Sequence, residues 1–209
     1  MNELNRALDE IGNIRRQVAR STEFRGYGPA TLAATGGIAL AAACAQAIWL
    51  PETAKYGAAS HAAPYLAIWI ATAVLAAGTI GVQMVTRSRR MHSGMAEEMI
   101  HMAVEQFLPA VGAGALLTVV LARFVPDALW MIPGLWQVIY SLGVFSSCRF
   151  LPRRMALAGA WYLLCGLTCL SLAGSRALAP WAMGVPFGVG QMLVAGILYF
   201  SAREEGEHA

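Results

Sequence analysis

Charged residues are scarce in this sequence. Asp, Glu, Lys and Arg together make up 13% of its 209 residues, about half of the roughly 25% that is usual in globular domains. A soluble protein of this length could not cover its surface with so few charges, and a disordered chain would need more of them. The net charge is only +3, and no basic run alternates with aromatic residues, so nothing indicates nucleic-acid binding.

The sequence patterns of the common enzyme classes are also missing. There is no Walker loop, kinase signature or dinucleotide-binding fingerprint. No Asp, Glu, Lys or His lies in the middle of a long apolar run, although a membrane hydrolase needs a nucleophile with a base and coupled transport usually needs an intramembrane acid. We therefore expect a protein that is not an enzyme and that carries no cofactor.

Cysteine is rare as well, with four residues in the chain. Cys44, Cys165 and Cys169 lie inside apolar runs, and Cys148 lies at the end of one. Reduced thiols at such positions pack as small apolar side chains. A disulfide framework is therefore not expected.

Apolar residues, by contrast, are abundant and make up 57% of the chain. A helix needs about 20 of them in a row to cross a bilayer. These stretches are apolar on every side, whereas the strands of a membrane β-barrel alternate between apolar and polar residues. The sequence thus predicts an all-α integral membrane protein with six transmembrane helices, at residues 29–50, 64–86, 107–125, 127–147, 155–173 and 177–201.

Basic residues are distributed unevenly among the segments that join these helices. Twelve of the 15 Lys and Arg residues lie in the N-terminal segment, the second and fourth loops and the C-terminal tail, and the others are Lys55, Arg123 and Arg176. Because basic segments stay in the cytoplasm, we predict that both termini are cytoplasmic and that the protein is a multi-pass protein of a bacterial inner membrane. Trp161 and Tyr199 are among the aromatic residues expected at the cytoplasmic interface.

Residues 1–28 are predicted to form a cytoplasmic segment ahead of the transmembrane domain, residues 29–201, and residues 202–209 a short cytoplasmic tail. Apolar residues recur at helical spacing through residues 2–20, which predicts an amphipathic helix. The apolar stripe of such a helix needs a cover, which can be the lipid bilayer, another part of the chain, a second copy of the chain or a cytoplasmic protein partner.

A second amphipathic helix is predicted in the cytoplasmic loop between the second and third spans, at residues 87–106. Its segment 91–106 is the other surface that could contact a partner or a second copy. Two of its residues have the Glu-x-x-His spacing by which one helix supplies two metal ligands in di-iron bundles. One interpretation is a solvated face with mutually supporting charges. The other is a metal or haem site that consists of His92, Glu98, His101 and Glu105.

Helix-breaking residues stand next to polar ones in the outer halves of the fourth and sixth predicted spans. Each span has a proline and, about one turn later, a glutamine. A proline inside a helix frees a backbone carbonyl, which a ligand, a water molecule or a neighbouring helix can satisfy in the membrane. Interrupted helices at corresponding positions are typical of transporter binding sites, although glutamines also hold helices together by hydrogen bonds. The candidate ligand site consists of Pro133, Trp136, Gln137, Tyr140, Pro186 and Gln191.

Small residues at four-residue spacing indicate where membrane helices approach each other closely, because they let the backbones come near. Three such pairs are present in the predicted spans. They are Ala33 with Gly37, Ala110 with Gly114, and Gly184 with Gly188.

Two stretches of the sequence resemble a known group of proteins. They are Ser-Thr-Glu-Phe-Arg-Gly-Tyr-Gly-Pro at residues 21–29 and Met-Ile-Pro-Gly-Leu-Trp-Gln at residues 131–137. On these motifs the chain resembles a group of uncharacterised bacterial six-helix inner-membrane proteins, and the likeness covers most of its length. The resemblance implies no activity and no functional residue.

These observations favour a non-enzymatic sensor, accessory subunit or scaffold that acts through its two cytoplasmic helices. The first alternative is a carrier or channel for a small uncharged solute, with its site at the fourth and sixth spans. The second alternative is a membrane protein that binds metal or haem through the loop between the second and third spans.

Overall fold

The computed structural model describes residues 28–49, 59–90, 95–148, 154–172 and 174–207, and every regular element in these ranges is a helix. Two short 3-10 helices, η1 (Pro126–Met131) and η2 (Gly174–Leu178), precede the fourth and the last of the α-helices. The prediction of an all-α fold is therefore confirmed for the described residues. The α-helices are α2 (Pro29–Trp49), α3 (Ala59–Arg90), α4 (Met95–Phe124), α5 (Ile132–Ser147), α6 (Met155–Leu172) and α7 (Pro180–Glu207).

Five helical stretches of the described chain are long and apolar enough to cross a membrane, and they coincide with five of the six predicted spans. This is the architecture of a multi-pass membrane protein. The five are Pro29–Trp49, Ala63–Gln83, Pro126–Ser147, Met155–Leu172 and Pro180–Ser201.

The remaining predicted span, residues 107–125, corresponds to a shorter apolar segment, Leu108–Phe124, in the C-terminal part of α4. The polar residues Glu105 and Gln106 come shortly before it in the same helix. The helix itself is long: α4 continues through Pro109 without interruption. The segment expected as a separate loop helix is therefore, from Met95 onward, the first part of α4.

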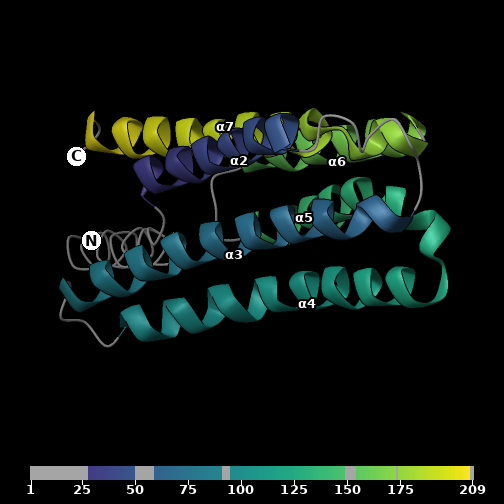
Figure 1. The fold of residues 1–209 in the computed structure, drawn as a ribbon. Helices are drawn as coiled ribbons and strands as arrows, with labels where there is room; N and C mark the ends of the chain where they lie inside the picture. Colours follow the sequence, from purple (N-terminus) through teal and green to yellow (C-terminus); the bar gives the residue numbers. More distant parts are fainter. Residues whose placement is uncertain (1–27, 50–58, 91–94, 149–153, 173, 208–209) are drawn as a thin grey trace, which may run out of the picture.

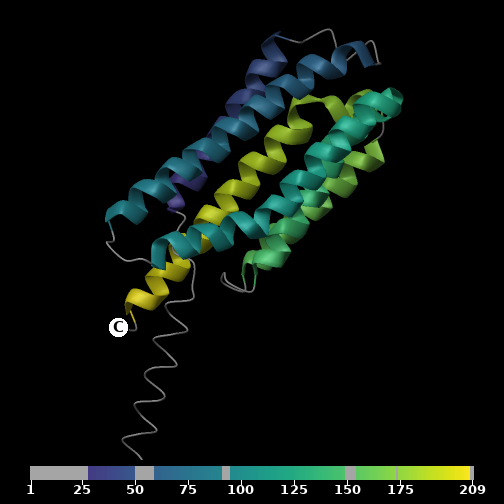
Figure 2. The ribbon, with the colours of Figure 1, turned by 90° about the horizontal axis from the view of Figure 1, so that it is seen from below.

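The helices follow the order α3, α2, α7, α6, α5, α4 around the bundle, each packed against the next. The contacts between α2 and α7 and between α5 and α6 are the most extensive. From below, α7 lies between the α2–α3 pair on one side and α4, α5 and α6 on the other (Figure 2). The first residues of α2 and the last residues of α7 lie at the same end of the bundle (Figure 1).

Neither of the two prolines produces the break in the outer half of its span that the sequence analysis predicts. Pro133 lies in the first turn of α5, directly after η1, where a missing backbone N–H leaves no hydrogen bond unmade. Pro186 lies inside α7, which continues as one helix from Pro180 to Glu207. The prediction of matching breaks in the two spans is therefore wrong, because one proline starts a helix and the other is accommodated inside one.

Glycines provide the closest approaches between helices. A Cβ at Gly36 of α2 would lie 2.9 Å from the carbonyl oxygen of Gly188 in α7. Gly134 of α5 and Gly166 of α6 face each other in the same way, since a Cβ on either would lie 2.8 Å from the carbonyl oxygen of the other. The predicted close contact at Gly188 is confirmed. That at Gly37 is wrong, because a Cβ there would meet no described atom within 4 Å.

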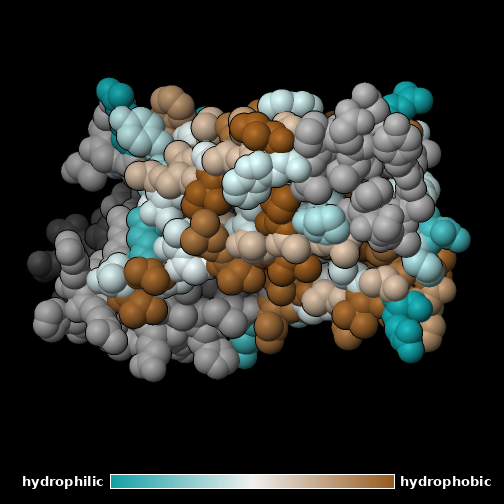
Figure 3. Space-filling model, viewed as in Figure 1, coloured by the Kyte–Doolittle hydropathy of each residue, from teal (hydrophilic) through white to brown (hydrophobic). Residues whose placement is uncertain are grey.

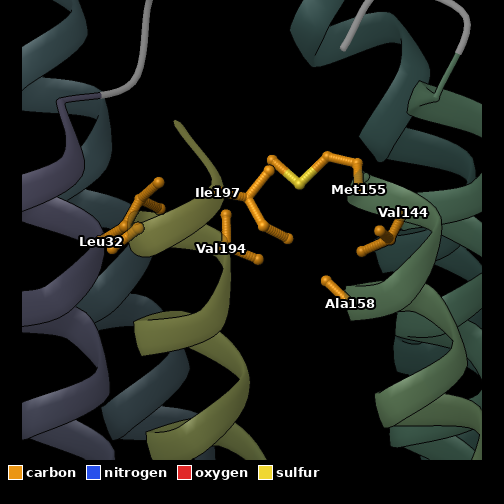
Figure 4. Close-up of a cluster of buried hydrophobic side chains, with 7 residues drawn as sticks. Leu32, Val144, Met155, Ala158, Val194 and Ile197 are labelled. Carbon is orange, nitrogen blue, oxygen red and sulfur yellow. The ribbon is translucent and has the colours of Figure 1, made fainter. Parts of the chain in front are cut away.

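A cluster of buried apolar side chains joins α2 and α7 to α5 and α6 (Figure 4). Leu32 of α2 packs with Val194 and Ile197 of α7, and this group meets Met155 of α6 and Val144 of α5. The side chain of Met155 extends from α6 toward Ile197. The core is therefore built where α7 passes between α2 and α6.

The outward faces of α3 and α4 are apolar and exposed. Val74 and Val82 of α3 and Leu116 and Val119 of α4 are each more than 60% exposed. In Figure 3 hydrophobic side chains form a band across the middle of the molecule, and the strongly hydrophilic residues lie mainly toward its two ends. A band of this kind suits contact with lipid chains.

Candidate ligand-binding site in the helix bundle

Pro186 creates a hydrogen-bonding problem inside α7, and a side chain from another helix solves it. Because proline has no N–H, the carbonyl of the residue four positions earlier, Ala182, loses its partner within the helix. Nε2 of Gln137, on α5, donates a hydrogen bond to this carbonyl at 2.8 Å. The same amide nitrogen lies 3.6 Å from the sulfur of Met183. Gln137 thus stabilises α7 at the position where its proline interrupts the backbone hydrogen bonds.

Three aromatic rings form the centre of the site. The ring centroids of Tyr140 on α5 and Tyr162 on α6 are 4.7 Å apart. The ring of Phe187 on α7 lies 5.4 Å from that of Tyr140 and 5.3 Å from that of Tyr162. Edge-to-face pairs at such distances are favourable beyond their buried area. These rings join α5, α6 and α7 around one point.

Two polar groups extend this arrangement along α7. Nε2 of Gln191 donates a hydrogen bond to the hydroxyl oxygen of Tyr140 at 3.0 Å. The hydroxyl of Tyr162 lies against Gly190, where a Cβ would collide with the tyrosine ring. Glycine at position 190 therefore lets the Tyr162 hydroxyl approach the α7 backbone directly beside Gln191. We call Gln137, Tyr140, Tyr162 and Gln191 the polar cluster.

Several polar atoms of this cluster have no hydrogen-bond partner. Oε1 of Gln137, Oε1 of Gln191 and the hydroxyl of Tyr162 are buried and unpartnered among the residues that the structure describes. Gln137 and Tyr162 are 0% exposed and Gln191 is 8% exposed. Buried polar groups in proteins are nearly always paired with protein, water or a ligand. The cluster can therefore bind a further molecule by hydrogen bonds.

The structure brings together only part of the set predicted from the sequence. Gln137, Tyr140 and Gln191 join α5 and α7 through hydrogen bonds, and Pro186 lies on α7 between the two positions at which these bonds are made, Ala182 and Gln191. Trp136 instead points toward α4, where its Nε1 donates a hydrogen bond to the hydroxyl of Thr118 at 2.9 Å. Pro133, at the start of α5, is buried and has no described contact with the cluster.

Sequence reasoning missed two members of the site on α6. Tyr162 is fully buried in the bundle, and the sequence analysis does not include it among the candidate site residues. Trp161 was expected at the cytoplasmic interface, but its Nε1 donates a hydrogen bond to the carbonyl oxygen of Pro186 at 3.0 Å. Both residues lie in an apolar run, and the only feature of the sequence that could have indicated a site there is a polar aromatic side chain in the middle of a span.

A second hydrogen-bonded network lies at the opposite end of α2 and was also missed. Oε1 of Gln46 accepts a hydrogen bond from Nε1 of Trp69 at 2.8 Å, and its Nε2 donates to the carbonyl oxygen of Leu178 at 3.0 Å. Gln46 is as deeply buried as the glutamines of the polar cluster. Both of its amide atoms are partnered, so it connects α2, α3 and η2 and leaves nothing for a ligand.

The predicted metal or haem site is largely outside the described residues. His92 is not described, and nothing is described of the side chains of Glu98 and His101, although both residues belong to α4. Glu105 is exposed on α4. Among the described residues, no group of three or more His, Cys, Asp or Glu residues could hold a metal ion. The metal hypothesis, with its four residues, stays a prediction.

The two surfaces predicted to contact a partner or a second copy also stay predictions, because they lie largely outside the described residues. Residues 2–20 lie outside the described residues, and of segment 91–106 the backbone is described only from Met95 onward.

Cys148 lies directly after the last residue of α5, outside the membrane-length stretch, and its Sγ lies 3.4 Å from the carbonyl oxygen of Val144. Burial raises the pKa of the Cys148 thiol, which favours its protonated form.

No protein-family model, curated protein or solved structure matches this chain significantly.

Proposed function

We propose that the chain crosses a bacterial inner membrane six times, with both termini in the cytoplasm. The common position of the start of α2 and the end of α7 supports an even number of crossings (Figure 1). The sixth crossing is Leu108–Phe124, which runs beside the membrane-length helices α3 and α5 as part of α4. The orientation follows from the basic residues, because basic segments stay in the cytoplasm and the Arg-rich end of α3 lies at the same end of the bundle as the start of α2 and the end of α7.

We further propose that the protein is a non-enzymatic carrier that binds a small uncharged solute at the polar cluster. The observation that carries this proposal is the set of three buried polar atoms without a partner, on Gln137, Tyr162 and Gln191. Each unpaired buried group costs about 1–3 kcal/mol. Three of them cost roughly 3–9 kcal/mol, which is comparable to the whole stability of a typical domain, about 5–15 kcal/mol. A bound molecule that completes these hydrogen bonds removes this cost.

The depth of the cluster supports a carrier. Gln137, Tyr140, Tyr162 and Gln191 each lie within one helical turn of the middle of their membrane-length stretch. Carriers bind their substrates near the middle of the bilayer, so that the site can open to either side.

The chemistry of the cluster supports an uncharged solute. Its side chains are amides and phenols, which bind through hydrogen bonds and include no nucleophile paired with a base. An ion at this depth would meet no opposite charge from these four residues, and burying an unpaired ion is far more costly than burying a hydroxyl or an amide.

Packing alone accounts for one part of the cluster. The bond from Gln137 to the carbonyl of Ala182 explains why a glutamine stands at position 137. It does not explain Oε1 of Gln191 or the hydroxyl of Tyr162, because neither atom makes a hydrogen bond to another helix among the described residues. The ligand proposal accounts for these atoms.

The test is the flux of neutral solutes into proteoliposomes, followed by light scattering after an osmotic step with urea, acetamide or glycerol. We expect faster entry of at least one solute than in protein-free liposomes, and at least a tenfold reduction of this excess in Gln191→Leu, because one of the binding groups is removed. Gln46→Leu is the matched control, since it removes an equally buried glutamine outside the cluster and should leave the flux unchanged.

Two results would contradict the proposal. One is a wild-type flux equal to that of empty liposomes for every solute tested. The other is an equal flux in wild-type protein and in a folded Gln191→Leu variant, which would leave the glutamine with a structural role only.

A further inference from the structure

The two glutamines of the polar cluster have different roles. The amide nitrogen of Gln137 donates to two atoms of α7, the carbonyl oxygen of Ala182 and the sulfur of Met183. Gln191 is two helical turns further along α7, and its nitrogen bonds to the hydroxyl oxygen of Tyr140. Oε1 of Gln191 has no hydrogen-bond partner among the described residues. The Tyr162 hydroxyl lies against Gly190, the residue that precedes Gln191. The groups that can meet one small molecule are therefore those of Gln191 and Tyr162.

These two groups require a particular kind of partner. Oε1 of Gln191 only accepts hydrogen bonds, so its partner must donate one. The Tyr162 hydroxyl can donate one and accept another. A molecule that only accepts hydrogen bonds could satisfy Tyr162 but would leave Gln191 unpaired. Sites built in this way discriminate strongly against analogues that lack the required polar hydrogen.

We infer that the ligand of this site is a small neutral molecule with an N–H or O–H donor and an adjacent acceptor, as in a primary amide or a polyol. It donates a hydrogen bond to Oε1 of Gln191 and accepts one from the hydroxyl of Tyr162. The rings of Tyr140, Tyr162 and Phe187 form the apolar wall beside it. This inference rests on the proposed function and specifies its substrate class.

The size of the ligand follows from the surroundings. The three rings lie in mutual contact, with centroids between 4.7 and 5.4 Å apart. A ligand that replaced one of these contacts would lose favourable aromatic packing. A molecule of a few heavy atoms fits this arrangement better than a sugar or a nucleoside.

The test uses pairs of probes that differ only in their polar hydrogens. Acetamide is compared with N,N-dimethylacetamide, and ethylene glycol with 1,2-dimethoxyethane, by saturation-transfer NMR on the full chain in lipid nanodiscs. We expect that at least one donor-bearing probe binds and that its methylated counterpart binds at least about tenfold more weakly, because the methylated molecule leaves Oε1 of Gln191 unpaired. This comparison uses the wild-type protein and does not depend on any variant being stable.

Variants then connect the binding to the named atoms. Tyr162→Phe removes a single oxygen, and Gln191→Leu removes the acceptor. Each should weaken binding of the donor-bearing probe by at least about tenfold. Gln46→Leu should bind the probe as the wild type does.

The outcomes separate this inference from the proposed function. Equal binding of both members of each pair would overturn the requirement for a donor, while a solute flux that depends on Gln191 would still support a carrier. If no probe binds but such a flux exists, the inferred hydrogen bonds of the ligand to Gln191 and Tyr162 are overturned and the carrier stands. If neither binding nor flux is found, the buried atoms are satisfied by water alone and both proposals fail.

Discussion

Gln137 and Pro186 are 49 positions apart in the sequence and form one structural unit in the bundle. The proline removes an N–H from α7, and the glutamine supplies another one to the same carbonyl, that of Ala182. Trp161 adds a hydrogen bond to the carbonyl of Pro186 itself. In a membrane, where no water reaches the helix backbone, a side-chain donor such as Gln137 makes a proline in mid-helix tolerable.

Replacement of Gln137 by leucine should therefore be costly only while Pro186 is present. We expect Gln137→Leu to destabilise the protein by about 1–3 kcal/mol, because it leaves the carbonyl of Ala182 unpaired. In a Pro186→Ala background the same change should cost less, since alanine restores the N–H at position 186. The measurement is a double-mutant cycle of thermal or denaturant unfolding in detergent. Equal costs in the two backgrounds would show that Gln137 does not act through this carbonyl.

Helix pairs in this protein are set by glycines rather than by large complementary side chains. α2 and α7 approach through Gly36, Gly184 and Gly188, and α5 and α6 approach through Gly134 and Gly166. The polar cluster depends on this packing, because α7 brings Gln191 and Phe187 to the site only when it lies close to α2 on one side and α6 on the other.

The adjacent glycines 36 and 37 should respond in opposite ways to the same change. Gly36→Ala should destabilise the protein by about 1–3 kcal/mol, because the added methyl group meets the backbone of Gly188, which cannot move away as a side chain can. Gly37→Ala should be neutral or stabilising by up to about 1 kcal/mol, because alanine favours the helix and its methyl group meets no described atom. Melting temperatures of the two variants in the same detergent check this, and equal shifts would contradict the α2–α7 contact.

In the bundle as a whole, α3 and α4 stand at the two ends of the helix order and touch each other only slightly. Their outward faces carry exposed apolar side chains, and the other helices enclose the polar cluster. This arrangement suits a protein that is surrounded by lipid and keeps its few polar groups in the interior.

The six-span arrangement makes a clear prediction about α4, whose apolar segment is the shortest. Reporter fusions after Arg90 should report a cytoplasmic position, and fusions after Asp127 an external one, because Leu108–Phe124 crosses the membrane between them. Fusions at Lys55 and Arg176 should be external, and a fusion at the C-terminus should be cytoplasmic. The measurement is the activity of alkaline phosphatase and green fluorescent protein fusions. A cytoplasmic report from Asp127 would mean that α4 does not cross.

The sequence was sufficient to predict that this chain is helical and where its membrane-length stretches lie. Hydropathy is a local property, and about 20 consecutive apolar residues need a membrane whatever their neighbours are. It also indicated Gln137, Tyr140 and Gln191, because a polar residue in an apolar run must find a hydrogen bond.

It did not indicate which helices are neighbours, and the errors in the site follow from that. These helices are apolar on all sides, and lipid is as apolar as their side chains, so no stripe of residues marks the face that turns inward. The side of α2 that meets α7, through Gly36 and not Gly37, depends on how the whole bundle packs. The same packing turns Trp136 toward Thr118 and brings Tyr162 beside Gly190. Hydrogen-bond partners that come from different helices become definite only when the helices have found each other.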